Sequence, residues 1–561
     1  MKIKKTNKYF FLFYLFLFFI INVLQGGFTQ LIDDEAYYWM WSKHLAWGYF
    51  DHPPMVALWI KISSIFFKGE LGVRFFSTIM FGFTVFLIWK LIDFKEKWNH
   101  VHEFFLMVTA VILFNFYGFI TVPDTPLLFF VALFLLAYKH FLKSENLKTI
   151  LLLGFAMAGM LYSKYHGILV ICFVVLSNVK LLKNKNFWKG SLLGFILFTP
   201  HLFWQYQNGF PSILYQFERS KKLYRIAFSI NHLLFQLLIV GLAFPVIYLA
   251  FFKSFKQKGL FTKALRFIVV GFIVFFFIST FKTSTQPQWT AVILIPLMVL
   301  GYPIILSKIK LKRWFIILAS LNLVGLILLR IFLADENLSP FKWETHENKI
   351  WAKTLKQNTK GLPIVFHNSF QYAAKYQFYT GIQTYSYNSL YYRLNQYDLP
   401  GYEEKMQGKT VYEVSNYKHG KLLSKKHNKL FYGQEIKNYT TFQHLKCIIK
   451  KPVLNLKGKL NYQLTFNLEN PYNVPVPIST IKFYGIFQTK KHQITKTIKF
   501  SKLKILNLKN PDSLSPLADY KVRINFLIPK HLDPLTTTFR IGIGFYDFPA
   551  GFEGNAIKII F

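Results

Sequence analysis

Apolar residues gather in the first 334 positions of the chain, in runs that approach the length needed to cross a membrane. About 20 helical residues span the roughly 30 Å hydrocarbon core of a bilayer. The pattern therefore predicts about eleven membrane-spanning helices. They are expected near residues 10–24, 71–92, 104–121, 126–141, 150–162, 167–182, 190–204, 232–252, 267–281, 291–306 and 314–333.

Two of the early apolar stretches need a separate interpretation. The run from Phe10 to Leu24 follows the basic segment MKIKKTNKY, which is also typical of a signal peptide. No Ala-x-Ala-like cleavage motif follows and further apolar runs come later, so we expect an uncleaved first helix. The stretch from Pro53 to Phe67 is too short to span and contains Lys61, which favours a helix lying along the membrane surface.

The polar and apolar pattern changes after Leu333. Residues 335–440 mix short helical and strand patterns and predict an α/β module. Residues 441–561 alternate polar and apolar positions between Asn, Pro, Asp and Gly turns, which predicts a β-rich, sandwich-like domain. The expected fold is thus a polytopic α-helical membrane domain, residues 1–334, followed by these two smaller domains.

Basic residues in the loops indicate the orientation of the helices. Loops such as DFKEK, KLLKNKNFWK and SKIKLKR alternate along the chain with loops such as TVPDTP, SKYHG and KTSTQPQW. The first set carries about three times as many Lys and Arg residues as the second, which predicts that the first set is cytoplasmic. The second set and everything after Leu333 would then lie outside the cytoplasm.

Composition adds less information. The formal charge of +41 is compatible with attraction to anionic lipids or phosphorylated substrates, and equally with a coding bias toward Lys. We expect no nucleic-acid partner. Cys172 lies in an apolar run and Cys447 in the polar tail, so a disulfide between them is not expected.

Acidic residues cluster in the predicted outer loops. DDEAYYWMWSKHLAWGYFDHPPMVA places Asp34 and Glu35 directly after the first helix, and Asp51 just before two prolines. Carboxylates close to hydrocarbon are costly and are functional candidates, and burial or a nearby cation tunes their pKa. Asp124, in TVPDTP, is a second candidate site, although it is also placed to cap the next helix. For Asp33, a position in a solvated loop explains the acid as well as a functional role does.

Cationic side chains are predicted on the same face, where they would suit a phosphate group. The alternative for Lys164 and Lys282 is snorkelling to the lipid headgroups, and for Arg219 a solvated loop. The full set of candidates is His52, Arg74, Lys164, His166, Arg219 and Lys282.

The first-loop sequence, followed by GELGVRFFS, resembles bacterial members of the protein O-mannosyltransferase superfamily, which include the lipid A aminoarabinose transferases. The resemblance extends through PDTPLLFF, YSKYHGILV, PHLFWQYQNGFPS and KTSTQPQW, and into the stretch SFQYAAKYQFYTG. It implies a GT-C membrane fold and a sugar donor linked to polyprenyl phosphate. No comparable resemblance covers the β-rich tail.

Carried over by position, the resemblance implies catalytic roles for the acids in the outer loops. Asp34 becomes the leading candidate for the general base, with Glu35 beside it, while Asp51 and Asp124 would orient the acceptor, hold Asp34 or ligate a metal. The six cationic candidates would stabilise the departing phosphate. The lipid A transferases have Arg and Lys where this chain has Tyr37 and His52, so the phosphate clamp differs here.

The predicted function is transfer of a sugar from a polyprenyl-phosphate donor to a lipid, glycan or protein acceptor. The expected location is a bacterial inner membrane, with the site outside the cytoplasm and among membrane lipids. An oligosaccharide ligase or polymerase, a lipid-linked sugar transporter and a glycan receptor are the alternatives. Asp and His residues leave a divalent metal ion open as a cofactor, but no tight ligand spacing is evident.

Overall fold

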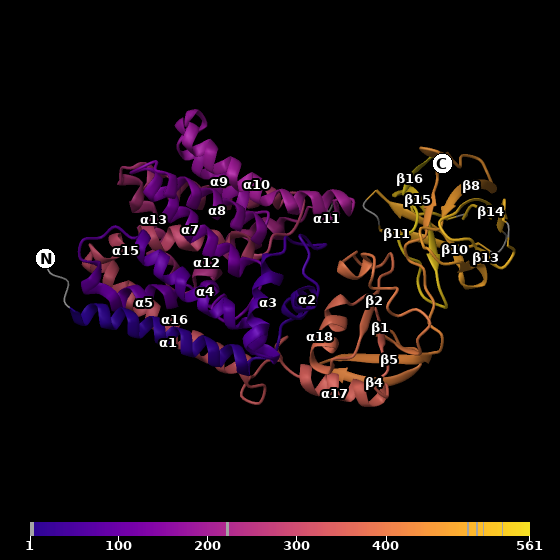
Figure 1. Cartoon of the computed structure of the whole chain (residues 1–561), viewed down its shortest axis with the longest axis horizontal. Coiled ribbons are helices and arrows are strands. Elements are labelled where there is room, and N and C mark those ends of the chain that lie inside the picture. The colour runs from indigo at the N-terminus through magenta and orange to yellow at the C-terminus, as the bar shows by residue number, and fades with distance from the viewer. Residues whose placement is uncertain are drawn as a thin grey trace. The chain divides into compact units, whose positions relative to one another are not determined.

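The computed structural model describes residues 5–219, 224–490, 493–500, 503–508, 510–529 and 531–560. The chain divides into two compact units, Met1–Lys349 and Ile350–Phe561. The first contains the apolar helices, and the second contains the sheets (Figure 1).

Unit 1 is built from helices of very different lengths. They are α1 (Lys5–Phe28), α2 (Asp33–Ser42), α3 (Met55–Phe66), α4 (Gly69–Leu91), α5 (Val101–Ala110), α6 (Ile112–Phe116), α7 (Asp124–Phe141), α8 (Leu147–Ser163), α9 (Gly167–Ser177), α10 (Lys185–Gln207), α11 (Pro211–Arg219), α12 (Ile226–Val240), α13 (Phe244–Lys253), α14 (Leu260–Ser279), α15 (Leu294–Leu306) and α16 (Ile309–Ala334).

The helices of unit 1 confirm a multi-pass membrane fold. Among the described residues, six helices are long and apolar enough to cross a bilayer, or up to seven if the bent pair formed by α12 and α13 counts as one span. Shorter apolar helices such as α8 and α9 fall below this length. The predicted number of eleven spans is therefore not confirmed, although each predicted run contains helix.

The predicted span 104–121 is broken into α5 and α6 at Val111. The side-chain amide of Asn115 donates hydrogen bonds to the carbonyl oxygens of Val108 and Thr109, at 2.8 and 3.2 Å, and to that of Val111 at 2.9 Å. An amide side chain that satisfies backbone carbonyl groups offers the chain an alternative to continued helix. A hydropathy pattern alone does not reveal that a side-chain amide competes with the backbone hydrogen bonds of the helix.

The predicted span 232–252 also changes direction, because α12 and α13 meet at an angle of 98°. Gly241 follows α12 with a φ angle of 81°, which a residue with a side chain rarely adopts. A Cβ atom there would lie only 2.7 Å from the Asn322 amide of α16. The bend therefore depends on a glycine that packs closely against a neighbouring helix.

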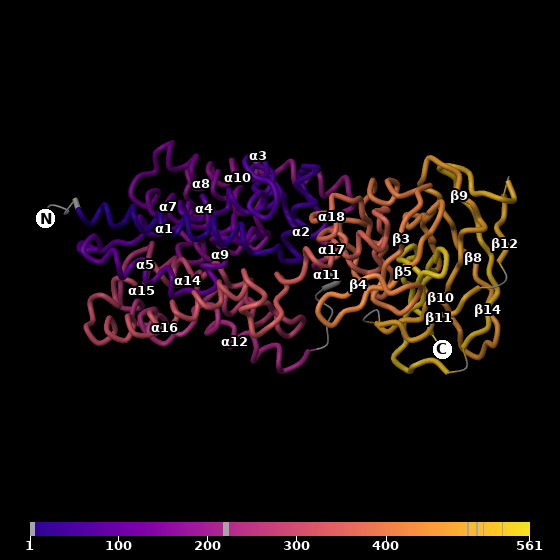
Figure 2. The backbone as a smooth tube through the Cα atoms, turned by 90° about the horizontal axis from the view of Figure 1, so that it is seen from below, coloured from indigo at the N-terminus to yellow at the C-terminus, as the bar shows by residue number. Residues whose placement is uncertain are grey.

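Helix α7 lies within the interior of unit 1 and packs against α4 and α8, and α8 packs against α10 (Figure 1). Gly154 and Gly190 allow the close approach of α8 and α10, because a Cβ at Gly154 would lie 2.5 Å from the Gly190 oxygen. Figure 2 shows α3, α4, α8 and α10 on one side of the unit and α12, α14, α15 and α16 on the other.

Unit 2 contains the α/β part of the chain, in which one five-stranded sheet has the order β2-β1-β3-β5-β4. Strand β1 pairs in parallel with β2 and β3, while β5 is antiparallel to β3 and β4. The elements are α17 (Asn348–Asn358), β1 (Ile364–His367), α18 (Phe370–Thr380), β2 (Thr384–Tyr387), β3 (Val411–Ser415), β4 (Lys421–Lys426) and β5 (Lys429–Ile436).

The remainder of unit 2 forms two larger sheets, with the orders β11-β10-β15-β16-β7 and β12-β14-β8-β6, and a two-stranded sheet of β9 (Val476–Pro477) and β13 (Ser513–Leu514). Strands β8 and β14 alternate buried and exposed positions, as expected for sheets that cover a shared apolar core. Their bounds are β6 (Lys446–Ile448), β7 (Val453–Asn455), β8 (Asn461–Glu469), β10 (Lys482–Thr489), β11 (Ile494–Lys499), β12 (Leu503–Leu506), β14 (Asp519–Leu527), β15 (Thr536–Gly544) and β16 (Ile557–Ile560). This strand-rich region confirms the predicted fold class.

A half-buried acid in unit 2, Asp398, makes the stability of the protein depend on pH. Burial raises the pKa of Asp398 to about 8, although the Asn395 backbone N–H and the Asn388 amide donate to its carboxyl group. The unfolded carboxyl group titrates near 3.9, so the folded state binds an extra proton between about pH 4 and pH 8. Stability attributable to this proton is present at low pH and is lost as the pH rises through this window.

We expect Asp398→Asn, which mimics the protonated acid, to melt at least about 3 °C higher than the wild type at pH 9. The two proteins should melt at nearly the same temperature at pH 4. Thermal melting of the purified full chain, followed by circular dichroism at both pH values, checks this. An equal difference at pH 4 and pH 9 would show that the effect does not come from the Asp398 proton.

Candidate active site

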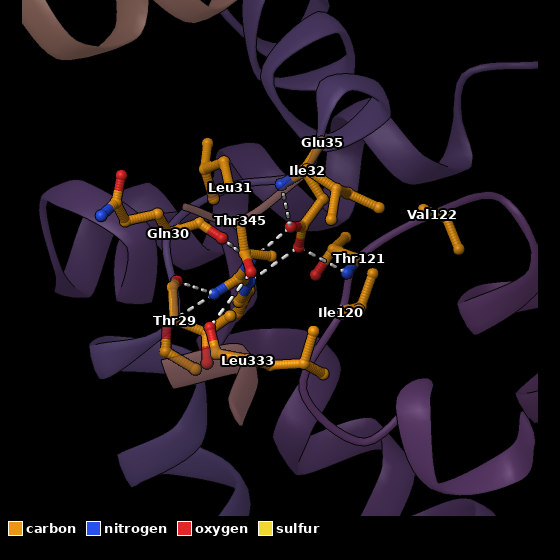
Figure 3. Close-up of polar contacts among 12 residues, drawn as sticks. Thr29, Gln30, Leu31, Ile32, Glu35, Ile120, Thr121, Val122, Leu333 and Thr345 are labelled. Atoms are coloured by element: carbon orange, nitrogen blue, oxygen red, sulfur yellow. Dashed lines mark hydrogen bonds and ion pairs between the residues drawn. The ribbon is translucent and has the colours of Figure 1, made fainter. Parts of the chain in front are cut away.

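The Glu35 carboxylate of α2 and the Arg74 guanidinium of α4 form a buried ion pair. Figure 3 shows the polar contacts around Glu35. Both side chains are 0% exposed. Glu35 lies in the first turn of α2, and Arg74 reaches it from α4. The Arg74 Nε atom lies 2.7 Å from Oε1 of Glu35, and Nη2 bonds to Oε2.

All five N–H groups of Arg74 have acceptors in this cluster. Besides the carboxylate, they donate to the carbonyl oxygens of Gly26, Thr29 and Gln30 at the end of α1 and just beyond it. A guanidinium group has five donors and no more. The Arg74 donors are therefore all satisfied within the protein, and the phosphate-binding and catalytic roles expected from the sequence for Arg74 and Glu35 stay predictions.

Glu35 also connects the first loop to the turn before α7. Its Oε1 atom accepts a hydrogen bond of 2.9 Å from the Thr121 backbone N–H (Figure 3). The Thr121 hydroxyl in turn lies 2.8 Å from Ser77 Oγ of α4. Since Thr121 precedes Asp124 by three positions, the stretch carrying Asp124 lies beside the start of α2.

Asp124 and Lys164 form a second buried ion pair. Helix α7 begins at Asp124, and Lys164 directly follows the last residue of α8. The Lys164 Nζ atom lies 2.8 and 2.9 Å from the two carboxylate oxygen atoms. The side chains are only 6% and 8% exposed, so each charge depends on the other for compensation.

A hydrogen-bond chain returns from this region to the first loop. The Tyr165 hydroxyl lies 2.9 Å from Nε2 of His201 on α10, and Nδ1 of His201 lies 2.7 Å from the Trp47 carbonyl oxygen. A carbonyl only accepts, so Nδ1 carries the proton and Nε2 accepts from Tyr165. In addition, Ser212 Oγ donates to the Tyr49 carbonyl oxygen at 3.0 Å.

These contacts link three polar segments in a closed circuit. The Glu35–Thr121 bond joins the first loop to the turn before α7, and the Asp124–Lys164 pair joins that turn to the segment YSKYHG. The bonds from Tyr165 to His201 and from His201 to Trp47 then lead back to the first loop. Three of the segments that the sequence predicted on one face are thus connected to one another.

Asp34 and Asp51 lie within the first of these segments. Asp34 is exposed, in the first turn of α2, whereas Asp51 is buried, just before α3. The His52 ring is half-buried and lies 6.1 Å from the Tyr38 ring of α2. Tyr37 is buried against Trp41.

Two other cationic candidates belong to neighbouring segments. The half-buried His166 ring lies 4.9 Å from Phe276 and 5.7 Å from Trp289. Lys282 is exposed in the loop that leads to Trp289. The backbone of Arg219 ends α11, and its side chain lies outside the described part of the chain.

No group of three His, Cys, Asp or Glu side chains arranged to hold a metal ion occurs within the described ranges. The side chains available in this region therefore do not fit a metal ion bound by protein ligands alone.

Neutral residues that organise the site were missed by the sequence analysis. Thr121 takes part through its backbone, which no sequence pattern reveals. His201 is 0% exposed and follows Pro200 in an apolar helix. A histidine within an apolar run is the sequence feature that could have indicated it.

Part of the chain matches a known family, and its fold is similar to that of a solved structure. Residues 51–204 match the family described as dolichyl-phosphate-mannose-protein mannosyltransferase. The fold resembles the crystal structure of ArnT from Cupriavidus metallidurans, with TM-scores of 0.53 in the apo state and 0.52 bound to undecaprenyl phosphate. The chain thus shares the fold of ArnT.

The similarity to these proteins extends over different lengths of the chain. The ArnT structures are 12% identical and cover 76% of this chain and 97% of their own. The lipid A galacturonosyltransferase RgtD of Rhizobium johnstonii is 27% identical over 153 residues, which are 26% of this chain and 31% of RgtD. The chain thus matches about a third of the length of this curated relative. The family match contains Asp51 and Asp124 but begins after Asp34.

Proposed function

We propose that this GT-C protein transfers a sugar from a polyprenyl-phosphate donor to a hydroxyl group of an acceptor. The observation that carries the proposal is the circuit of contacts that connects acidic and cationic segments of an ArnT-like fold. ArnT has been seen bound to undecaprenyl phosphate, and the matching family takes its name from a dolichyl-phosphate sugar. Both support a lipid phosphate as the leaving group.

The reaction would be a single displacement at the anomeric carbon. The acceptor oxygen forms a bond to that carbon while the bond from the carbon to the donor phosphate oxygen breaks. The acceptor proton passes to a carboxylate, and the electron pair of the broken bond leaves with the polyprenyl phosphate. Because phosphate is already a tolerable leaving group, the protein mainly supplies positioning and charge stabilisation.

Asp34 is the carboxylate we assign as general base. Glu35 is engaged by Arg74 and Asp124 by Lys164, so neither is available to take a proton without disrupting a buried ion pair. Asp34 is exposed and therefore accessible to an acceptor. Asp51 is buried later in the same loop segment, and we assign it to orienting the acceptor or Asp34.

The donor phosphate would be bound by His52, His166 and Lys282. Lys282 is exposed, and its loop leads to Trp289, which contacts His166. Lys164 contributes less net charge because Asp124 compensates it. In this proposal, His52, His166 and Lys282 bind the phosphate in place of Arg74 and Lys164.

The asymmetry of basic residues supports the orientation of the site. With the Lys- and Arg-rich loops in the cytoplasm, the first loop, Asp124 and unit 2 lie outside it. In a bacterial inner membrane this is the face where a lipid-linked sugar meets envelope acceptors. The acceptor would be a lipid, a glycan or a protein, and the name of RgtD makes lipid A the first to examine.

Mass spectrometry of the envelope tests the proposed function. We expect cells lacking the protein to lose a single sugar-sized mass from one class of lipid, glycan or protein, and to regain it when the wild-type gene is restored. Restoration should coincide with consumption of a polyprenyl-phosphate sugar. Identical envelope profiles with and without the protein would contradict a role in sugar transfer.

A further inference from the structure

One face of the sheet with the order β12-β14-β8-β6 is directed to solvent. Its strands β8 and β14 lie side by side (Figure 1), and buried positions on their inner face alternate with exposed or half-buried positions on the outer face. The central polar residues of the outer face are Gln463, Thr465 and Asn467 of β8, Lys521, Arg523 and Asn525 of β14, and Lys504 of β12. We call this set of residues the polar face.

Three cations of the polar face lie beside one another. Lys504 is directly opposite Arg523 in the antiparallel pair of β12 and β14, and Lys521 is the next outward residue of β14. Side chains opposite each other in such a pair have Cβ atoms about 5 Å apart, and like charges there repel. In the part of the chain that the structure describes, these three side chains have no ion-pair or hydrogen-bond partner. The protein therefore leaves their positive charge uncompensated.

The acids on the strands of this sheet lie at one end of the polar face. Asp519 is directly opposite Glu469, which is in turn opposite Lys446 of β6. Asp519 precedes Arg523 by four positions on β14, which corresponds to about 14 Å along the strand. Exposed charges farther apart than the Debye length, about 8 Å at physiological ionic strength, are largely screened. These acids therefore do not neutralise the pair formed by Arg523 and Lys504.

Neutral polar side chains adjoin the cations. Asn525 is directly opposite Gln463, and Arg523 is directly opposite Thr465. The side chains of Asn525, Gln463 and Thr465 make no hydrogen bond within the described ranges. An amide or a hydroxyl side chain both donates and accepts, as the hydroxyl groups of a sugar do, whereas Lys and Arg match carboxylate or phosphate groups. The polar face thus offers partners for both kinds of group.

Exposed apolar side chains are sparse on this surface. Leu527 at the end of β14 is exposed, whereas Leu506 of β12 and Ile448 of β6 are half-buried. The outward positions of these four described strands carry no aromatic residue. A surface that binds a lipid bilayer combines cations with apolar or aromatic side chains that enter the hydrocarbon boundary. The composition of the face therefore favours a hydrophilic polymer over a membrane surface.

We propose that the polar face binds an acidic glycan, which is a saccharide chain that carries carboxylate or phosphate groups. The three cations pair with the anionic groups, and the amide and hydroxyl side chains beside them hydrogen-bond to the sugar hydroxyls. Binding of this kind is a role of unit 2 and goes beyond sugar transfer. Only the further step of identifying the bound glycan with the acceptor rests on the proposed function.

Binding of defined polymers to the purified full chain, held in nanodiscs of phosphatidylcholine, tests this assignment. The probes are polygalacturonate, which carries carboxylates, phosphomannan, which carries phosphates, and dextran, which carries neither. Lys504→Gln combined with Arg523→Gln removes two positive charges from the polar face. The matched control is Lys496→Gln combined with Lys499→Gln, which removes two charges from exposed positions of β11 in the other large sheet.

We expect the wild type to bind at least one of the two acidic polymers, and to bind dextran at least about tenfold more weakly than that polymer. The variant with Lys504→Gln and Arg523→Gln should bind the acidic polymer about tenfold more weakly than the wild type, and the β11 control within about twofold. Because all four positions are exposed, both variants should melt at the temperature of the wild type or higher.

Gln463→Ala combined with Asn525→Ala tests the neutral part of the polar face, because it leaves every charge in place. We expect this variant to bind the acidic polymer about three- to fivefold more weakly, owing to lost hydrogen bonds to hydroxyl groups. Unchanged binding would show that the face attracts any polyanion and does not recognise a glycan.

Other results would also overturn the assignment. Failure to bind either acidic polymer is one, and equal losses in the polar-face variant and the β11 control are another, since these would reflect only the net charge of the chain. If the polar-face variant binds both polymers normally but no longer co-sediments with phosphatidylglycerol vesicles, the face binds a membrane instead. None of these measurements involves sugar transfer, so a failure here leaves the proposed function standing, and a protein that transfers no sugar leaves the binding result standing.

Discussion

Asp34→Asn should reduce sugar transfer by about 10²- to 10⁴-fold, the usual contribution of a positioned general base. The amide keeps the shape of the side chain but has no oxygen that takes up a proton near neutral pH. Because Asp34 is exposed, its replacement should leave the amount of protein in the membrane and its melting temperature unchanged. Transfer measured by mass spectrometry, normalised to the protein level, gives the size of the effect.

Asp33→Asn is the matched control, since it removes one negative charge from the same turn of α2 and should retain transfer. Asp51→Asn serves as the competing test. If it abolishes transfer while Asp34→Asn stays within tenfold of the wild type, Asp51 is the base and the assignment of Asp34 is wrong.

Arg74→Ala should destabilise unit 1 by about 3–5 kcal/mol, because it leaves the buried Glu35 carboxylate without its counter-ion. It also leaves the three carbonyl oxygens of Gly26, Thr29 and Gln30 without these donors. We expect a strong fall in the membrane level of the variant and in the melting temperature of the purified protein. Loss of transfer would follow from loss of the fold.

Arg74→Lys and Lys282→Ala distinguish a structural role from phosphate binding. Lysine keeps the charge but has three donors for five acceptors, so Arg74→Lys should be intermediate in stability. Lys282 is exposed, and its removal should weaken stabilisation by undecaprenyl phosphate without lowering the melting temperature of the free protein. If Arg74→Ala proves stable yet loses only its response to undecaprenyl phosphate, Arg74 binds the phosphate after all.

The sequence predicted the membrane fold because hydropathy reports burial in lipid directly. Each predicted run contains helix, and the strand-rich tail follows the alternation of polar and apolar residues. The interruptions at Val111 and Gly241 were missed, because they depend on the amide of Asn115 and on the packing of Asn322. Such contacts arise only once the helices are assembled.

For the site, residue type indicated which positions carry charge but not how the charges pair. Glu35 and Arg74 are 39 positions apart, and Asp124 and Lys164 are 40 positions apart, so no local spacing connects them. Pairing of this kind depends on how helices pack. It changes the interpretation of four candidates, since a compensated charge stabilises the fold or positions a ligand, whereas an uncompensated one attracts an anion.

The Arg74 cluster has a consequence for how this protein tolerates change over evolution. Three of its five bonds end on main-chain carbonyl oxygens, which every amino acid supplies. The anchor itself therefore sets no requirement on the side chains at Gly26, Thr29 and Gln30. Glu35 and Arg74 have no such latitude, and a lineage that loses one should lose or replace the other in the same step.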